Sequence, residues 1–567
     1  MKIPYGISHF KSLITEGYLY VDKTLFINVL EEQGKYNILL RPRRFGKTLF
    51  LSTLRHYYDI RCKDAFDALF GHLAIGRNPT PLKNSYQILF MEFSGISIKG
   101  EESIERDFAF EVTKRLRIFL NEYQYPAEAV RRVEEQSSPA SLMKAFLEIV
   151  REAKIYLFID EYDHFANALL GEDQELFSAI VGKGGFVRAF YEVIKTATME
   201  GIVDRLFITG VTSITLDSMT SGFNIGKNLS FNKECNEALG FTGQETEAMI
   251  QPLVDACGLD KQEMMRTLGD WYNGYRFSSR ADEKVFNPDM VLYFLDSFDR
   301  DECRWPEKML DDNIASDYGK IMRLFGIGDR ERNFETLEEL IVNGEIIGRH
   351  KGKLDLDMHK PFERNDFISL LLYMGFITIS GTVLSQLRYV IPNYVIQKLY
   401  YDYFRAEIKR RAQIGVSGRA VEHAVAELAL HNNINPLLDE IRSVLALFSN
   451  RDFMRMDEKH IKAVILTLLN QSEVYFIRSE PEVNKRYPDI LLLERKPIEV
   501  RYQFLFELKF SKKKDGAKGM EAKRVEEIEQ MRGYHALADI KRLSKLQSYV
   551  LLTDGTEMEA VAVCGTG

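Results

Sequence analysis

Hydrophobic residues in the first 235 positions gather in short runs that alternate with longer amphipathic stretches. Four of the runs have the length and composition of buried strands: Asn37–Leu40, Tyr86–Phe93, Ile155–Ile159 and Arg205–Val211. Two of the stretches between them have helical periodicity: Ser103–Tyr123 and Ser138–Arg151. This alternation of strands and helices predicts a mostly parallel sheet with helices on both of its faces.

Helical periods dominate residues 236–450, which are interrupted by turn signals such as Asn273-Gly274. Within this region, Asp366–Ser380 is followed by LRYVIPNYVIQKLYYDYF, and the two together predict a helix, a small hairpin and another helix. The middle region is therefore expected to be a helical lid that contains a winged-helix-like part.

A third pattern begins at about residue 451. The helical stretch Asp457–Leu469 leads into four apolar runs: Val474–Ile477, Asp489–Leu493, Phe504–Phe510 and Ser548–Leu552. These runs predict a second, smaller α/β domain. The chain is therefore expected to be an α/β multidomain protein with parts at 1–235, 236–450 and 451–567.

Composition narrows the class of protein. Of the 567 residues, 45% are hydrophobic and 28% are charged, which is ordinary for a soluble globular protein. The net charge of −8 excludes a general polyanion-binding surface, so a nucleic-acid site would have to be a local basic patch. The longest apolar stretch, Phe367–Ile379, is too short to span a bilayer. No membrane association is expected.

The cysteines bear on the cellular compartment. Five are scattered along the chain without a CxxC pair: Cys62, Cys235, Cys257, Cys303 and Cys564. This spacing argues against a zinc site and against a disulfide framework. Together with an N-terminus that lacks a signal-peptide pattern, it predicts a cytoplasmic protein.

The stretch RPRRFGKTL, residues 41–49, contains the end of a phosphate-binding loop. It follows an apolar strand and precedes an amphipathic helix, so backbone N–H groups at the helix start could hold phosphates. Lys47 would reach the β- and γ-phosphates of ATP, and Thr48 would hold Mg²⁺. The candidate nucleotide-binding residues of the loop are Arg43, Arg44, Phe45, Gly46, Lys47, Thr48 and Leu49.

The start of this loop is unusual, because Arg41 stands where a phosphate loop ordinarily has its first glycine. Arg41 also precedes Pro42, which favours extended backbone, so the loop must start differently. Arg43 and Arg44 add positive charge beside the phosphates. The sequence therefore supports ATP binding more firmly than ATP hydrolysis.

A second candidate element is IYLFIDEYD, in which a buried strand runs into Asp160 and Glu161. Asp160 could complete the Mg²⁺ shell, and Glu161 could deprotonate the attacking water. The alternative is a buried strand that ends in a solvated acidic turn. The upstream GKT favours the catalytic interpretation.

Paired carboxylates reappear in RYPDILLLERKPIEVRYQFLFELKF, residues 486–510. The spacing fits two paired strands that bring Asp489 and Glu507 together. Two close carboxylates need a cation, and Mg²⁺ prefers such oxygen ligands, including the Leu508 carbonyl. Lys509 faces the same side of the strand as Glu507 and could stabilise a developing phosphate charge. This arrangement predicts metal-assisted phosphodiester hydrolysis, with Mn²⁺ as an alternative to Mg²⁺.

Several segments together resemble one family: IPYGISHFKSLITEGYLYVDKT, RPRRFGKTL, FIDEYD, TGVTSI, WYNGYRF, VFNPDMVLYFL, LLLYMGFITI and IPNYV. They are similar to bacterial AAA-ATPase-like proteins that carry a C-terminal PD-(D/E)XK nuclease-like domain. That family's loop itself reads RPRRFGK, so Arg41 is a family feature. This chain departs from the family at Asp289, where an aromatic residue commonly follows Asn-Pro.

The resemblance implies an N-terminal P-loop (RecA/AAA-like) fold and a C-terminal restriction-endonuclease-like fold. It places Thr209 where related ATPases sense the γ-phosphate, and it leaves Arg188 and Arg205 as candidate arginine fingers. Tyr20 is either an adenine contact or an aromatic packed under the sheet. In the nuclease-like part, Glu458 is either a metal-assisting acid or a solvated helix-start acid.

The QxxxY pair Gln530 and Tyr534 would support the nuclease-like site, and Lys512-Lys513-Lys514 would either hold a nucleic-acid backbone or form a solvated loop. The sequence thus predicts an ATP- and Mg²⁺-dependent ATPase and nuclease that acts on nucleic acid, with DNA favoured over RNA. A homo-oligomer stays open. The rival hypothesis is a nucleotide-switched scaffold with a vestigial nuclease fold that recognises a protein partner.

Overall fold

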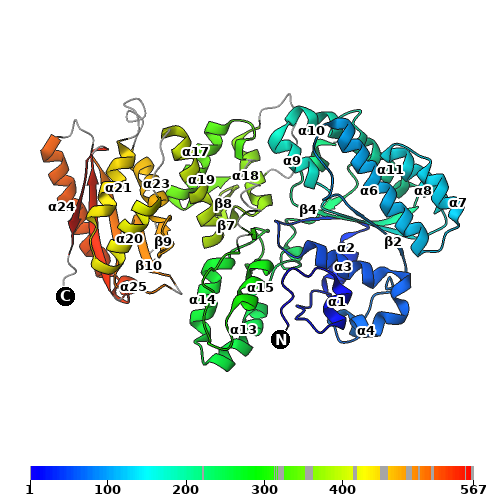
Figure 1. Cartoon of the computed structure of the whole chain (residues 1–567), viewed down its shortest axis with the longest axis horizontal. Coiled ribbons are helices and arrows are strands. Elements are labelled where there is room, and N and C mark those ends of the chain that lie inside the picture. The colour runs from blue at the N-terminus through cyan, green and yellow to red at the C-terminus, as the bar shows by residue number, and fades with distance from the viewer. Residues whose placement is uncertain are drawn as a thin grey trace.

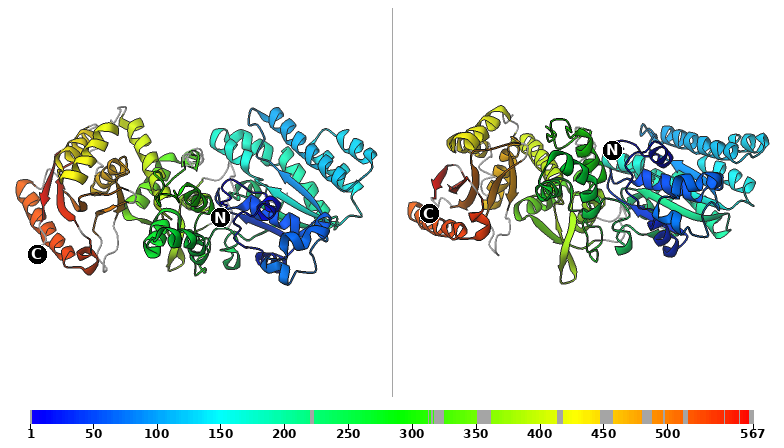
Figure 2. Two further views of the ribbon diagram at one scale, coloured as in Figure 1. Left: turned by 60° about the horizontal axis from the view of Figure 1, so that its bottom comes forward. Right: turned by 90° about the horizontal axis from the view of Figure 1, so that it is seen from below.

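The structure is a computed structural model of the whole chain. It describes residues 2–219, 223–311, 313–314, 316, 325–350, 362–412, 418–446, 457–479, 488–495, 498–511, 516–543, 545–555 and 557–563. Three parts lie in a row, from the N-terminal sheet through a helical middle to a C-terminal sheet (Figure 1). The turned views show the same order (Figure 2).

The N-terminal sheet confirms the four predicted strands. Its strands are β1 (Tyr36–Leu40), β2 (Gln87–Glu92), β3 (Ile155–Asp160), β4 (Val203–Gly210) and β5 (Lys227–Asn228). They are all parallel, in the order β2-β3-β4-β1-β5. Only β5 was not predicted, because its two residues are exposed and carry no hydrophobic signal.

Helices cover both faces of this sheet, as the alternation predicted (Figure 1). The longer ones are α2 (Phe26–Gln33), α3 (Lys47–Tyr58), α6 (Glu101–Glu122), α7 (Ala127–Glu134), α8 (Pro139–Ile149), α9 (His164–Glu172), α10 (Gln174–Val181) and α11 (Phe186–Met199). Shorter ones are α1 (Phe10–Thr15), η1 (Ile60–Ala65), α4 (Phe66–Phe70), α5 (Ala74–Arg77), α12 (Ile214–Ser218) and η3 (Lys233–Cys235). Every residue of β3 is buried, which explains its uninterrupted apolar run.

The middle region contains the predicted winged-helix-like part. Strands β6 (Glu345–Gly348), β7 (Thr378–Val383) and β8 (Gln386–Val390) form an antiparallel sheet in the order β6-β8-β7. Helix α18 (Arg364–Met374) precedes the hairpin, and its residues from Asp366 to Met374 are all buried. Because this helix has no free face, it is not positioned to enter a nucleic-acid groove.

The other middle helices lie mostly between the N-terminal and C-terminal sheets (Figure 1). They are α13 (Gly243–Cys257), α14 (Lys261–Tyr272), α15 (Pro288–Ser297), α17 (Arg330–Asn343), α19 (Tyr394–Ala412), α20 (Gly418–His431) and α21 (Asn435–Leu445). Helices α20 and α21 pack against the C-terminal domain, although they precede residue 451 (Figure 1).

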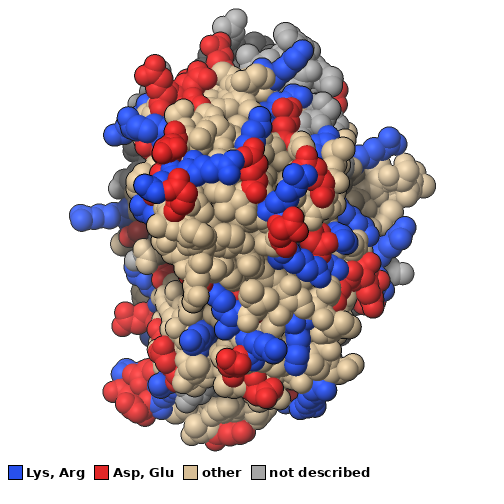
Figure 3. Space-filling model, turned by 90° about the vertical axis from the view of Figure 1, so that its right-hand side faces the viewer, with Lys and Arg blue, Asp and Glu red and all other residues tan. Residues whose placement is uncertain are grey.

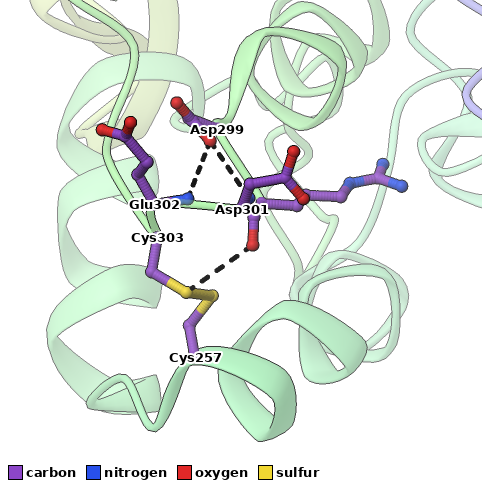
Figure 4. The surroundings of a disulfide bond; sticks show 6 residues. Cys257, Asp299, Asp301, Glu302 and Cys303 are labelled. Carbon is purple, nitrogen blue, oxygen red and sulfur yellow. Dashed lines mark hydrogen bonds between the residues drawn. A yellow bond between two sulfur atoms is a disulfide. The ribbon is translucent and has the colours of Figure 1, made fainter.

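One cysteine pair corrects the sequence interpretation. Cys257, at the end of α13, forms a disulfide with Cys303, in the turn that follows α15 (Figure 4). The two are 46 positions apart and share no motif, so only the folded chain reveals the pair. Cys62 and Cys235 are free thiols, and Cys564 lies outside the described residues.

The C-terminal sheet has the order β13-β12-β11-β10-β9. Its elements are α23 (Glu458–Leu469), β9 (Tyr475–Ser479), β10 (Ile490–Glu494), β11 (Gln503–Phe510), α24 (Gly516–His535), α25 (Ala538–Lys541), β12 (Leu546–Thr553) and β13 (Met558–Ala562). Strands β11 and β12 are parallel, and the other neighbours are antiparallel. The four predicted strands are confirmed, and β13 is an addition.

Charges on the outer end of the N-terminal domain are mixed (Figure 3). Lys and Arg side chains are interspersed with Asp and Glu across that face. Among the described residues, no helix is both long enough and apolar enough to cross a membrane.

Candidate nucleotide site and candidate metal centre

The predicted phosphate loop lines a cavity of about 500 Å³. The loop runs from the end of β1 to Gly46, which precedes α3 in the left-handed conformation with φ 79°. All seven predicted loop residues contact the cavity: Arg43, Arg44, Phe45, Gly46, Lys47, Thr48 and Leu49. The start of α3 therefore lies at the cavity, where helix N–H groups can receive phosphate oxygens.

Lys47 is held inside the loop. Its Nζ donates to the carbonyl oxygens of Arg41 at 3.1 Å and Pro42 at 2.9 Å. Burial lowers the pKa of its ammonium, while the nearby Glu161 and Asp160 oppose that shift. The ammonium thus has carbonyl partners that phosphate oxygens could replace.

The two carboxylates at the end of β3, Asp160 and Glu161, lie next to the phosphate loop. Burial raises the pKa of Asp160 to about 6, and the Thr48 hydroxyl hydrogen-bonds to this carboxyl group. Glu161 contacts the cavity and has a positive φ of 47°. The two predicted Mg²⁺ ligands, Thr48 and Asp160, are therefore brought together.

His164 adds a residue that the sequence did not assign. Its Nδ1 lies 3.3 Å from Glu161 Oε2, and both side chains contact the cavity. The hydrogen bond to His164 lowers the pKa of Glu161. A carboxylate that stays ionised and oriented at the phosphate end of the cavity is suited to accept a proton from water.

Other candidates from the ATPase resemblance lie away from the cavity. The Thr209 hydroxyl donates to the Leu39 carbonyl at 2.9 Å, and this residue is buried between strands. Arg188 pairs with Glu192 at 2.9 Å, and Arg205 donates to the Gly34 carbonyl at 3.3 Å. The structure does not bring these three residues to the nucleotide cavity.

Asp163, the last acid of IYLFIDEYD, has a structural role that the sequence did not reveal. Its buried carboxylate accepts hydrogen bonds from the backbone N–H groups of Val211 and Thr212 and from the Thr212 hydroxyl. These bonds join the segment after β3 to the segment after β4. They fix the position of the loop that carries Glu161.

Arg41 explains the unusual start of the loop. Its guanidinium is buried and donates to the carbonyls of Ser230 and Cys235, each at 2.7 Å. It also lies 4.0 Å from the ring centre of Phe277. Burial lowers the pKa of Arg41 to about 9. Arg41 does not line the nucleotide cavity. Its side chain joins the start of the loop to the segment around Ser230 and Cys235 and to Phe277 of the middle region.

The middle region forms one wall of the nucleotide cavity. Asp289 pairs with Arg44 of the loop at 3.1 Å, and Glu245 pairs with Lys23 at 2.7 Å. Tyr20 contacts the cavity and also packs on Phe10, with ring centres 5.4 Å apart. Its role as an adenine contact stays a prediction. The nucleotide cavity therefore lies at a junction between two parts of the chain.

In the C-terminal domain, the pairing of β10 with β11 is confirmed. Ile490 pairs with Phe506 in an antiparallel register, which sets Asp489 opposite Glu507. Glu507 is 2% exposed, and its Oε1 has no hydrogen-bond partner. Burial and the adjacent Asp489 raise the pKa of Glu507 to about 9. A buried, unsatisfied carboxylate oxygen beside a second carboxylate fits a divalent cation.

Helices α23 and α24 complete this site. Glu458 accepts the Phe510 backbone N–H at 3.1 Å, so it joins α23 to β11, and burial raises its pKa. Gln530 donates to the Tyr534 hydroxyl at 2.9 Å, and Tyr534 hydrogen-bonds to Glu507. The QxxxY pair therefore supports the site through Glu507.

Two further charged residues at this site were missed. Glu527 of α24 is buried and pairs with Lys509 at 3.0 Å. Lys462 of α23 is also buried and pairs with Asp489 at 3.1 Å. Both lie at helical spacing from predicted residues, three before Gln530 and four after Glu458. That spacing is the sequence signal that could have found them.

The described residues contain no group of three or more His, Cys, Asp or Glu side chains spaced to hold a metal ion. A cation at this centre would therefore depend on Asp489, Glu507 and a backbone carbonyl such as that of Leu508. The basic run Lys512-Lys513-Lys514 lies outside the described residues.

The fold defines the chain as a P-loop α/β domain joined through a helical region to a second α/β domain of the restriction-endonuclease type. Residues 4–220 match the AAA-ATPase-like family, described as a predicted AAA-ATPase. Residues 456–562 match the PD-(D/E)XK nuclease superfamily. The two ends of the chain thus match the two families that the sequence resembles, so the inferred resemblance is confirmed.

A curated relative is also similar to this chain. It is an uncharacterized protein in the vnfD 5′ region of Azotobacter chroococcum mcd 1, and it is 30% identical over 302 residues. The match covers 52% of this chain and 52% of the relative, so the chain spans about half the length of the curated protein it matches.

Proposed function

We propose that this chain binds and hydrolyses ATP with Mg²⁺ and is a Mg²⁺-dependent nuclease whose action depends on the nucleotide. The observation that carries this proposal is the pairing of Asp489 with Glu507, two carboxylates on adjacent strands beside Lys509. The matches to an AAA-ATPase-like family and to the PD-(D/E)XK superfamily support it.

In the N-terminal domain, the loop backbone and Lys47 would bind the β- and γ-phosphates, and Arg43 and Arg44 would neutralise them. Mg²⁺, held by Thr48 and Asp160, would supply charge compensation on the phosphates. Glu161 would accept the proton of the attacking water, and His164 would keep Glu161 ionised. Thr209 would act only through its bond to β1, since it does not reach the cavity.

In the C-terminal domain, Asp489, Glu507 and the Leu508 carbonyl would hold Mg²⁺ or Mn²⁺, which polarises the scissile phosphate when bound. Lys509 would stabilise the charge that develops on the phosphate oxygens. The Glu458 carboxylate fixes the end of β11. Gln530 orients Glu507 through Tyr534.

One short segment supports a dependence of the nuclease on the nucleotide. In Trp271–Phe277, hereafter the bridging segment, Phe277 packs on Phe45 of the phosphate loop with ring centres 5.4 Å apart. At the other end, Arg495 of the C-terminal domain lies 5.3 Å from the centre of the Trp271 ring. The bridging segment thus contacts the domain with the nucleotide cavity and the domain with the candidate metal centre.

The backbone of the bridging segment is tightly constrained. Gly274 has a φ of 107°, and a Cβ at this position would lie 2.0 Å from the Pro392 carbonyl oxygen. Asn393 donates to the Asn273 carbonyl at 2.9 Å. A constrained segment is suited to carry a displacement from one end to the other.

Nucleic acid is the proposed substrate, with DNA favoured over RNA. The proposed domains are residues 1–235, 236–450 and 451–567.

A second function, a nucleotide-switched scaffold, is favoured by one observation. Lys462 and Glu527 neutralise Asp489 and Lys509 within the domain itself. A vestigial site would have the same ion pairs.

Cleavage of single- and double-stranded DNA and RNA, with Mg²⁺ or Mn²⁺ and with or without ATP, separates the two functions. We expect metal-dependent cleavage that Glu507→Gln abolishes and that Lys47→Ala alters only when ATP is present. Absence of cleavage in every combination, with ATP binding intact, would support the scaffold.

A further inference from the structure

Lys462 lies inside the candidate metal centre, although no motif places it there. It belongs to α23, one turn after Glu458, and its side chain is 3% exposed. Its Nζ donates to Asp489 Oδ1 at 3.1 Å. A lysine is almost never this deeply buried without a partner of opposite charge.

Asp489 is therefore held at both oxygens. Oδ1 accepts from Lys462, and Oδ2 accepts the Leu508 backbone N–H at 2.8 Å. These two bonds fix the rotation of the carboxylate relative to Glu507. A carboxylate oxygen has two lone pairs, so Oδ1 can keep the bond to Lys462 and still face a cation.

The charges of the centre are distributed unequally. Glu527 pairs with Lys509 and Asp489 pairs with Lys462, whereas Glu507 keeps an unsatisfied buried oxygen. A cation that enters between Asp489 and Glu507 meets one carboxylate already neutralised by an ammonium. It also meets the repulsion of that ammonium at short range.

We propose that Lys462 is a positioning residue that orients Asp489 and weakens metal binding at this centre by acting as an internal counter-ion. The inference rests on the proposed metal-dependent nuclease function, but it concerns residues of the apo protein. In the metal-free protein the ammonium stabilises the carboxylates. In the metal-bound protein the ammonium opposes the ion.

The test compares Lys462→Met with wild-type Lys462 in the full chain without nucleotide, using Mn²⁺ as the only probe. Every protein in the test carries Asp160→Asn, which removes a proposed metal ligand of the nucleotide site. Calorimetry should show Mn²⁺ binding about tenfold tighter in Lys462→Met, because the opposing charge is removed. The metal-free variant should melt at a lower temperature than wild type, and Mn²⁺ should restore its melting temperature. A lysine with a purely structural role would lower both melting temperatures and leave the Mn²⁺ affinity unchanged.

Three further variants sharpen the test. Lys462→Arg keeps the charge and should bind Mn²⁺ as wild type does. Lys462→Gln keeps a hydrogen-bond donor to Asp489 without the charge, so it should bind Mn²⁺ more tightly than wild type does. If Lys462→Met does not fold, the result for Lys462→Gln decides the test. Lys459→Met, an exposed position on the same helix, is the matched control and should change neither quantity.

Unchanged or weaker Mn²⁺ affinity in both neutral variants overturns the proposal. So does failure of both to fold when they are refolded with Mn²⁺. The result is separable from the proposed nuclease function: if Mn²⁺ binds and tightens as expected but no nucleic acid is cleaved, Lys462 is a counter-ion in a metal-binding scaffold. If wild type and all variants bind no Mn²⁺, the metal centre itself is refuted and the inference with it.

Discussion

Phe45 of the phosphate loop packs edge-on against Tyr275 of the bridging segment, with ring centres 4.9 Å apart. Phe45 contacts the nucleotide cavity, whereas Tyr275 lies four residues from Trp271, which faces Arg495 of the C-terminal domain. Two residues of this loop, Arg44 and Phe45, therefore contact the middle region. The packing of Arg41 explains why the loop departs from the glycine-rich pattern.

We expect Phe45 and Tyr275 to act as a unit in nucleotide binding. Phe45→Leu and Tyr275→Leu should each weaken ATP affinity, because each removes the same contact at the cavity wall. In a double-mutant cycle, the coupling energy should be about 0.5–1.5 kcal/mol, the range for an aromatic pair. Calorimetric titration with ATP and Mg²⁺ measures it. Phe110→Leu, at an exposed position, is the control, and an additive result would contradict the coupling.

Lys47 is expected to carry much of the affinity for the triphosphate. Lys47→Ala should weaken binding of ATP with Mg²⁺ by about 2–3 kcal/mol, because a charge-assisted contact to the phosphates is lost. Lys99→Ala, at an exposed position, should bind as wild type does. Equal affinities of wild type and Lys47→Ala in calorimetry would refute the site.

Hydrolysis should depend on Glu161 and on its histidine neighbour. Glu161→Gln should keep ATP bound and stop turnover. His164→Ala should move the acidic limb of the turnover profile to higher pH, because the bond that lowers the pKa of Glu161 is lost. His72→Ala, at an exposed position, is the control. If wild type shows no turnover above background with any nucleic acid added, the nucleotide site is a switch rather than a motor.

The sequence predicted what short-range patterns encode. Buried parallel strands are continuous apolar runs, so β1 to β4 could be found, and PD followed by ExK in apolar runs located Asp489 and Glu507. The sequence could not show the partners of Lys462 and Asp163, because a buried ion or carboxylate is satisfied by atoms far along the chain. The Cys257–Cys303 disulfide was missed because its two cysteines are far apart in the sequence.

Arg41 shows how such a long-range contact changes an interpretation. From the sequence, Arg41 in place of the usual glycine, followed by Pro42, made ATP hydrolysis less secure than ATP binding. In the structure its guanidinium is buried among the carbonyls of Ser230 and Cys235. The Arg41 side chain thus has structural partners outside the nucleotide cavity, and its packing explains why this residue replaces the glycine.

Metal binding at Asp489 can be tested without a substrate. Asp489→Asn is a better test variant than Asp489→Ala because of the contact with Lys462. Alanine would leave the buried ammonium of Lys462 without a partner, whereas asparagine keeps an oxygen acceptor. Mn²⁺ should raise the melting temperature of the wild-type chain by mass action, and Asp489→Asn should lose that response. The comparison belongs in an Asp160→Asn background without nucleotide, which removes a proposed Mg²⁺ ligand of the nucleotide site.

Glu526→Ala, at an exposed position of α24, is the matched control for that experiment and should keep the full response to Mn²⁺. Equal shifts in wild type and Asp489→Asn, or no shift in either, would mean that Asp489 does not bind the ion.

The last prediction concerns the dependence of stability on pH. Burial and Asp489 raise the pKa of Glu507 from its ordinary value near 4.5 to about 9 in the metal-free protein. The folded protein therefore holds a proton that the unfolded chain has released between these two values. Its contribution to stability is fully present below about pH 4.5 and is lost as pH rises toward about 9.

The melting temperature of the metal-free wild type should therefore fall across this window, and Glu507→Gln should remove that part of the fall, because glutamine stays neutral. Mn²⁺ should act in the opposite direction: its affinity should rise with pH, since the ion replaces the proton on Glu507. Melting curves at several pH values, with and without Mn²⁺, measure both effects. If Glu507→Gln melts with the same pH dependence as wild type, the pKa of Glu507 is not raised in the folded protein. The expected proton on this carboxyl group is then refuted.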